Sequence, residues 1–352
     1  MIRRPPRSTP KPSSAASDVY KRQIRNRISS LPERYSSALF QFDEVVVHGL
    51  DAIQFISNFM TADLNRLKVD ECCDAFFCDA RGWILDIAVV VRGVDRVRVL
   101  VARGRGQDIA SHLSRYHIKE ELIIYQTQEN LHSMLLSGSQ TEFLLERYFE
   151  ISTPIDVYQQ FPEKGDSKFF STRTTNATLM IVDWISPRSF LLIVPEQKKS
   201  VLEEFVEYNE ISNATDEIIT YARLQQGWPL ASDIPVKTIP QEVGLNDRAI
   251  SFTKGCYLGQ ETVARLDALG HVNRRLVVFD VEQGGELVVG DSVASGGDDV
   301  SHVTSVGYFS EDDKVLVMAI MPLKALQDKA SLTVAGRRAT ILPSILLDSI
   351  AT

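Results

Sequence analysis

Three short runs of alternating apolar residues follow one another at about 72–78, 83–92 and 96–102. The segments between them, Asp79-Ala80-Arg81-Gly82 and Gly93-Val94-Asp95, have the composition of β-hairpin turns. The sequence therefore predicts a largely antiparallel sheet here. Helical patterns flank the strands at about 51–60 and 106–116, which is typical of an α+β fold.

The chain continues in the same manner and then changes character. Strands are expected near 121–126, 178–183 and 189–194, helices near 197–208 and 215–226, and an extended, proline-containing loop over 229–253. From Arg275 onward the pattern is strand and turn, with apolar runs at 275–281, 287–289, 303–309, 314–320 and 331–341. This predicts a small β-barrel domain that begins near residues 272–275.

Composition excludes several classes of protein. The 352 residues are 44% hydrophobic and contain no apolar run long enough for a membrane span, so no membrane partner is expected. Residues 24–352 hold 32 basic and 45 acidic side chains, a net charge of −13. Such a field repels a phosphate backbone, so we expect no direct nucleic-acid binding outside a local basic patch.

Residues 1–23 do not match the rest of the chain. This stretch is rich in Arg, Ser and Pro and has one acidic residue, which is not the composition of a folded element. Two interpretations remain open, an organellar transit peptide or a segment foreign to the natural protein. Because its four prolines would break a targeting helix, the second is favoured and a cytoplasmic location is expected. A genuine transit peptide would instead indicate the mitochondrial matrix.

The segment Lys254–Arg265 carries the most chemistry. It places Lys254, Cys256 and Tyr257 in a glycine-bracketed turn at the start of a helix. A helix N-terminus and a nearby cation both favour an anionic ligand or a thiolate at Cys256. A purely structural turn with an inert thiol is the alternative. No second Cys or His stands at ligand spacing, so no metal site is predicted, and Cys72, Cys73 and Cys78 are expected to be buried.

As a whole, Lys254–Arg265 resembles the signature K-G-C-Y-x-G-Q-E-x-V-A-R of the YgfZ family, the folate-binding relatives of the glycine-cleavage T-protein. Other matches occur in the expected order over about residues 38–280: Thr61-Ala62-Asp63, Cys78-Asp79-Ala80-x-Gly82, Ile239-Pro240-Gln241-Glu242, and Gly270 followed by Arg274-Arg275-Leu276.

The resemblance implies a T-protein-like ring. Two interleaved α+β subdomains with mainly antiparallel sheets (24–274) and a C-terminal β-barrel (275–352) would surround a cavity that holds tetrahydrofolate. It also implies an accessory factor for iron–sulfur cluster assembly or repair in client enzymes, including tRNA-modifying ones. Lys254 and Cys256 would be central to activity. Folate contacts would come from Asp86, Gln225, Tyr257, Gln260, Glu261, Arg265 and Arg274.

Two positions depart from the T-protein pattern. Leu85-Asp86 replaces an adjacent acidic pair, and Gln225 stands where the T-protein has a pterin-contacting glutamate. Asp86 can still hydrogen-bond a pterin, and an amide at Gln225 can do so without a charge. These departures disfavour, without excluding, an aminomethyltransferase or methyltransferase of the T-protein class. A scaffold that has lost its ligand is the third hypothesis.

Overall fold

The computed structural model describes residues 34–128, 130–149, 166–171, 178–186, 188–269, 272–309, 314–327 and 331–343. The expectation for residues 1–23 lies outside these ranges. Over the described ranges, no helix combines the length and the apolar character that crossing a membrane would require.

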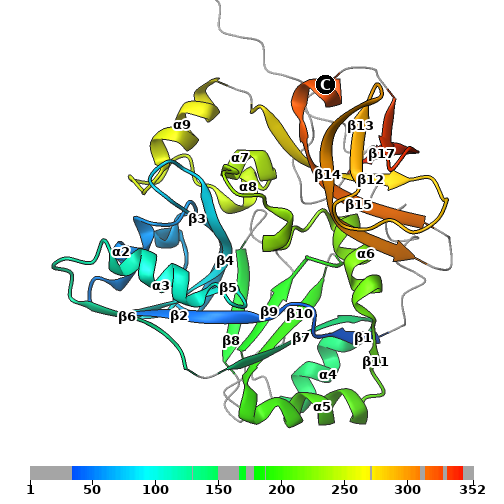
Figure 1. Cartoon of the computed structure of the whole chain (residues 1–352). Helices are drawn as coiled ribbons and strands as arrows, with labels where there is room; N and C mark the ends of the chain where they lie inside the picture. The colour runs from blue at the N-terminus through cyan, green and yellow to red at the C-terminus, as the bar shows by residue number, and fades with distance from the viewer. Residues whose placement is uncertain are drawn as a thin grey trace, which may run out of the picture.

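One half of the main sheet is built mostly from the first third of the chain (Figure 1). The predicted hairpins at 72–102 form as β3, β4 and β5, each antiparallel to the next. Two helices, α2 and α3, cover one face of this half. Its elements are β2 (Phe42–Gly49), α2 (Ala52–Ser57), η1 (Leu64–Arg66), β3 (Glu71–Cys78), β4 (Ile84–Arg92), β5 (Arg96–Ala102), α3 (Gly106–Ser114) and β6 (Leu122–Gln126).

The other half interleaves with the first along the chain. It contains β1 (Arg34–Ser37), β7 (Leu131–Gly138), α4 (Thr141–Tyr148), β8 (Asp166–Ser171), β9 (Thr178–Val182), β10 (Ser189–Pro195), η3 (Glu196–Lys198), α5 (Lys199–Tyr208) and β11 (Ser212–Asn213). Because β8 pairs with both β3 and β9, the halves join in one sheet of order β11-β1-β7-β10-β9-β8-β3-β4-β5-β2-β6. All of these pairings are antiparallel except β1 with β11.

A second unit is a closed six-stranded barrel of order β12-β15-β14-β13-β16-β17. Its elements are β12 (Arg274–Val281), β13 (Ser292–Ser295), β14 (Asp298–Phe309), β15 (Lys314–Pro322), α10 (Leu323–Gln327), β16 (Leu332–Val334) and β17 (Arg337–Leu342). The predicted fold class, α+β with antiparallel sheets and a C-terminal barrel, is therefore confirmed. The strand expected at 287–289 is wrong, because Val288 and Val289 are exposed in a turn and pair with no strand.

Five short elements connect the sheet to the barrel: α6 (Asp216–Gln226), η4 (Ala231–Asp233), α7 (Pro240–Val243), α8 (Asn246–Ala249) and α9 (Gln260–Leu269). The prediction that 229–253 is entirely extended is wrong. Pro240 occupies the first position of α7, where its fixed φ suits a helix and its missing N–H costs no hydrogen bond. The Glu242 carboxylate accepts from the N–H of Ile239 and so caps the same turn.

Burial on both faces of the sheet explains why some strands are apolar throughout. In β3, Cys73, Ala75 and Phe77 pack beneath α2 and α3, whereas Cys72, Phe76 and Cys78 face a central core. That central core also receives residues from α6, α8 and the outer face of the barrel. The two halves of the sheet and the barrel therefore meet at this central core, where α6, α7 and α8 lie in Figure 1.

Candidate functional site

Lys254 holds the signature turn to the segment that follows α2. Its Nζ donates to the backbone carbonyl oxygens of Ser57 at 2.6 Å, Met60 at 2.8 Å and Ala62 at 2.8 Å. Burial lowers the pKa of Lys254 to about 8, so the ammonium needed for three donations persists at neutral pH. All three protons are used, which leaves none for an anionic ligand. Its predicted catalytic role stays a prediction.

The residues after Lys254 continue this attachment. The N–H of Leu258 donates to the carbonyl of Asn58 at 2.8 Å. The Tyr257 ring lies 5.1 Å from the Lys254 ammonium and is buried in the central core, and this burial raises the pKa of its hydroxyl. The Gln260 side chain accepts from the N–H of Tyr257 at 3.3 Å. Tyr257 and Gln260 thus shape the turn.

Two glycines bring the signature turn against the hairpin between β3 and β4. Gly259 has φ +82°, and a Cβ there would lie 2.6 Å from the carbonyl oxygen of Asp79. A Cβ at Gly82, which has φ +79°, would lie 2.9 Å from the Cβ of Thr262. Only glycine permits this approach. The matches at residues 78–82 and 254–265 are therefore one packed unit.

The remaining matches join the same unit. Thr61 donates its hydroxyl to the carbonyl of Ala249 at 2.6 Å. The Gln241 side chain donates to the carbonyl of Val263 in α9. Arg274 forms an ion pair with Glu242 at 2.8 Å across the junction with the barrel. Segments distant in sequence are thus held together by specific polar contacts.

Cys256 is exposed, whereas Cys72, Cys73 and Cys78 are buried as expected. Glu261 and Arg265 are also exposed, on the outer side of α9. Within the described parts of the chain, no group of three or more His, Cys, Asp or Glu is placed to hold a metal ion. The thiol of Cys256 is therefore the one among the four cysteines that an external molecule can reach.

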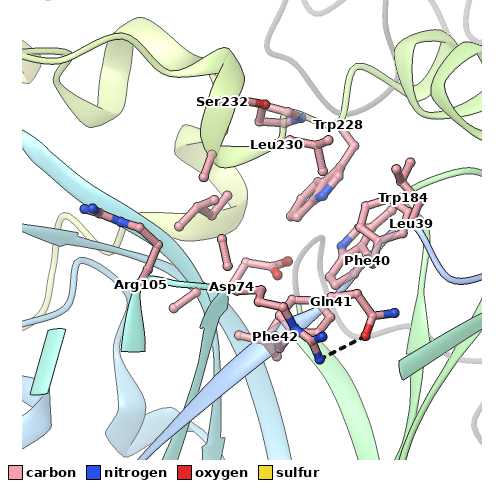
Figure 2. Close-up of a pocket in the computed structure, with 17 residues that line it drawn as sticks. Leu39, Phe40, Gln41, Phe42, Asp74, Arg105, Trp184, Trp228, Leu230 and Ser232 are labelled. Carbon is pink, nitrogen blue, oxygen red and sulfur yellow. Dashed lines mark hydrogen bonds between the residues drawn. The ribbon is translucent and has the colours of Figure 1, made fainter. Parts of the chain in front are cut away.

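A separate cavity of about 330 Å³ lies in the central region (Figure 2). Trp184 and Trp228 stack on one side with ring centroids 4.9 Å apart and planes 12° apart. Arg105 lies on the opposite side and Asp74 between them. The lining residues are Leu39, Phe40, Gln41, Phe42, Asp74, Ile87, Ala88, Val89, Ala102, Arg103, Arg105, Trp184, Trp228, Pro229, Leu230, Ala231 and Ser232.

An ion pair between Asp74 and Arg248 stabilises the wall of this cavity. The Arg248 guanidinium donates to the Asp74 carboxylate and, at 2.6 Å, to that of Asp183. The same guanidinium lies 5.0 Å from the Trp228 ring. Burial lowers the pKa of Arg248, but the carboxylates of Asp74 and Asp183 raise it by more, so its charge is permanent. The arginine therefore fixes one wall and one carboxylate of the cavity.

Asp86 directly precedes Ile87 in β4 and has Arg105 as an electrostatic partner; Ile87 and Arg105 line this cavity, whereas Asp86 is not among its lining residues. One carboxylate oxygen accepts from the N–H of Ile87 at 2.8 Å, while Oδ2 is buried and meets the hydrogen-bond criteria with no partner among the described residues. Burial raises the pKa of Asp86 to about 6, against the lowering effects of the Ile87 N–H, the Arg105 charge and the Ala102 N–H. Leu85, at the other position of the T-protein pair, packs instead against the core beneath α2 and α3.

The predicted folate contacts do not gather at one place. Asp86 is buried in β4, Gln225 is buried in α6, and Arg274 is paired with Glu242. The lining residues of the cavity include none of the predicted site residues. Folate binding by Gln225, Tyr257, Gln260, Glu261, Arg265 and Arg274 stays a prediction.

Sequence reasoning missed the aromatic and basic residues of the cavity: Phe40, Phe42, Arg103, Arg105, Trp184 and Trp228. They come from four separated segments, so no local motif connects them. In the sequence, Gly227-Trp228-Pro229 indicates the end of the helix expected at 215–226 and does not by itself indicate a cavity.

Comparisons with known proteins agree with this geometry. A family model described as the GCVT N-terminal domain matches residues 38–254. A protein of Colwellia psychrerythraea named tRNA-modifying protein YgfZ is 22% identical over 304 residues, covering 84% of this chain and 87% of that protein. One of the same name from Yersinia enterocolitica is 26% identical over 238 residues, 66% of each chain.

A solved structure shares the fold. The crystal structure of glycine cleavage system aminomethyltransferase T from Bartonella henselae matches with a TM-score of 0.72 and 16% identity. The match covers 92% of this chain and 88% of that one. At this identity the likeness extends to the architecture of sheet and barrel.

Proposed function

The chain belongs to the GCVT N-terminal domain family and, within that superfamily, to the YgfZ family, and from this premise we propose that it binds tetrahydrofolate and serves as an accessory factor for iron–sulfur enzymes. Its relatives carry the name of tRNA-modifying proteins. Because residues 24–352 have a net charge of −13, an effect on tRNA is better explained through a client enzyme than through direct contact.

The observation that carries the folate proposal is the buried Oδ2 of Asp86, which has no hydrogen-bond partner among the described residues and belongs to the residue before Ile87 of the aromatic cavity. A buried carboxylate oxygen without a donor is costly unless a ligand supplies one. The pterin ring of a folate is planar and carries N–H donors on one edge. Asp86 would accept from that edge, and Trp184 and Trp228 would supply the apolar surface that a flat heterocycle requires.

The size and charge of the cavity also fit. Its volume of about 330 Å³ suits the heterocycle rather than the whole cofactor. Arg103 and Arg105 line it and would meet the negatively charged glutamate tail of a folate. When bound, tetrahydrofolate supplies a reduced ring that carries one-carbon units. The chain's own residues bind that ring, orient it and exclude water from it.

Cys256 is the proposed point of contact with the client. Its thiol is exposed. The hydrogen bonds that Lys254 donates and the close approach of Gly259 to Asp79 fix the turn that presents it. A fixed, accessible thiol is suited to acting on, or shielding, a sulfur or iron centre of another protein. The folate cavity and the thiol are thus two separate parts of the function.

A transferase of the T-protein class is the second candidate, favoured by the shared architecture with aminomethyltransferase T. Leu85 disfavours this candidate, because the Leu85 side chain packs into an apolar core where the T-protein pair supplies a carboxylate. Turnover of tetrahydrofolate with a dihydrolipoyl-bound aminomethyl donor would select this candidate over the accessory factor.

Anaerobic titration calorimetry of the full chain with tetrahydrofolate tests the proposal. We expect saturable binding that weakens at least about tenfold in Asp86→Asn, since a hydrogen bond to a charged group contributes about 1.5–3 kcal/mol. Asp95→Asn is the matched control, because Asp95 is exposed in the turn between β4 and β5 and its side chain contacts the exposed His48. Absence of binding at millimolar ligand would refute the folate proposal.

A further inference from the structure

Trp83, at the end of the β3–β4 hairpin, orders two cations on the surface. The Arg81 guanidinium lies 4.8 Å from the centre of the Trp83 ring, and the Lys237 ammonium lies 5.5 Å from it. Both cationic side chains are exposed, and the indole is half-buried. We call these three residues the hairpin cation surface. A ring that attracts both cations reduces the entropy lost when they meet a ligand.

Neither cation has a negative partner. Over the ranges that the structure describes, Arg81 and Lys237 form no ion pair, whereas Arg223, Arg248 and Arg274 all do. The adjacent acid, Asp79, uses Oδ1 to accept from the backbone N–H groups of Arg81 and Trp83 at 2.9 Å each. In a chain whose body carries −13, two ordered cations without counter-charges form a local positive site.

This surface lies next to the turn that presents Cys256. Gly82 precedes Trp83 directly and packs against Gly259 and Thr262. Cys256 is three residues before Gly259, so their Cα atoms are at most about 11 Å apart. The loop that supplies Lys237 also exposes 86% of the Val236 side chain. Cations, an aromatic ring and an apolar side chain therefore stand near the exposed thiol.

We propose that the hairpin cation surface docks an acidic segment of a client protein and so brings the client to Cys256, a step that rests on the proposed accessory function. Tryptophan and arginine are the residue types that contribute most to protein interfaces. The overall negative field disfavours a long polyphosphate chain, whereas a short acidic peptide needs only a local match.

Fluorescence anisotropy of the full chain with a labelled oligoglutamate peptide tests this docking. We expect salt-sensitive binding that weakens about tenfold or more in Arg81→Glu/Lys237→Glu, because each exposed pair contributes up to about 1 kcal/mol and reversal adds repulsion. Trp83→Leu keeps the apolar bulk and removes the ring that orders the cations, so an intermediate loss is expected.

Arg96→Glu/Lys119→Glu is the matched control. It changes the net charge equally, and Arg96 lies at the far end of the β4–β5 hairpin from Trp83. Equal loss in both double variants, or no binding by the unmodified chain, would overturn the proposal. Tighter binding of oligouridylate through Arg81 and Lys237 would also overturn it, in favour of RNA.

Tetrahydrofolate affinity separates this inference from the function on which it rests. The Arg81→Glu/Lys237→Glu variant should bind folate normally and still fail to support an iron–sulfur enzyme in cells that depend on this chain. Normal support by that variant contradicts the docking surface alone. If the unmodified chain does not bind tetrahydrofolate, the result contradicts the proposed function alone.

Discussion

Replacing Asp86 with Asn should stabilise the ligand-free chain at neutral pH while weakening folate binding. The pKa of Asp86 rises from 3.8 to about 6 on folding, because the carboxylate is buried. Between these two values the folded chain holds a proton that the unfolded chain has lost, so the free energy of unfolding falls as the pH rises. Above about pH 6 the full penalty applies, and two pKa units correspond to about 3 kcal/mol.

Asparagine removes this charge and keeps an acceptor for the N–H of Ile87. Its amide nitrogen then occupies the place of the unpartnered Oδ2, which costs about 1–2 kcal/mol when no acceptor is near. The net expectation is a gain of about 1–2 kcal/mol in the free energy of unfolding near pH 7.5. The advantage should nearly vanish near pH 5, where the penalty on the native aspartate falls to about half of its value at pH 7.5.

Urea unfolding at both pH values, followed by near-ultraviolet circular dichroism and tryptophan fluorescence, measures this difference. Asp95→Asn serves again as the control, since the Asp95 carboxylate is exposed. A variant that is less stable than the parent near pH 7.5, or whose advantage does not change with pH, would refute the reasoning. Greater stability combined with weaker folate binding would indicate that Asp86 is kept for its ligand.

Three other substitutions test the signature turn and the packing of β14 against α6. Cys256→Ser should leave the urea midpoint unchanged and abolish support of an iron–sulfur enzyme in dependent cells; retained support would exclude the thiol role. Lys254→Met leaves three carbonyls without a donor and should lower the free energy of unfolding by about 2–4 kcal/mol, with folate affinity in calorimetry unaltered. Gly307→Ala places a Cβ 2.6 Å from the Cα of Tyr221 and should cost at least about 2 kcal/mol in urea unfolding, because β14 must move away from α6; an unchanged midpoint would show that this contact yields easily.

The fold was largely predictable because its signals are local. Strands β3, β4 and β5 alternate with tight turns, and the barrel strands alternate apolar residues facing inward and outward. Local signals failed where position within an element decides the outcome. Pro240 begins a helix rather than preventing one, and Val288 and Val289 belong to a turn despite their β-branched side chains.

The cavity was not predictable because it depends on tertiary assembly. Phe40 precedes β2, Arg105 precedes α3, and Trp184 and Trp228 follow β9 and α6. No spacing along the chain relates these residues. The signature segment, by contrast, is contiguous and can be identified from the sequence alone, although its most prominent charge, on Lys254, is used for backbone carbonyls rather than for a ligand.

This division gives the signature a physical explanation. A segment that binds a ligand directly needs only the atoms that touch the ligand, whereas Lys254, Tyr257, Gly259 and Gln260 contact the chain itself. Within that turn, Cys256 supplies an exposed thiol. The turn that presents this thiol is therefore fixed by contacts with segments near residues 60, 80 and 241. Gly259→Ala would place a Cβ 2.6 Å from the carbonyl oxygen of Asp79. This variant should impair client support as severely as loss of the thiol does, and the folate cavity should still bind its ligand.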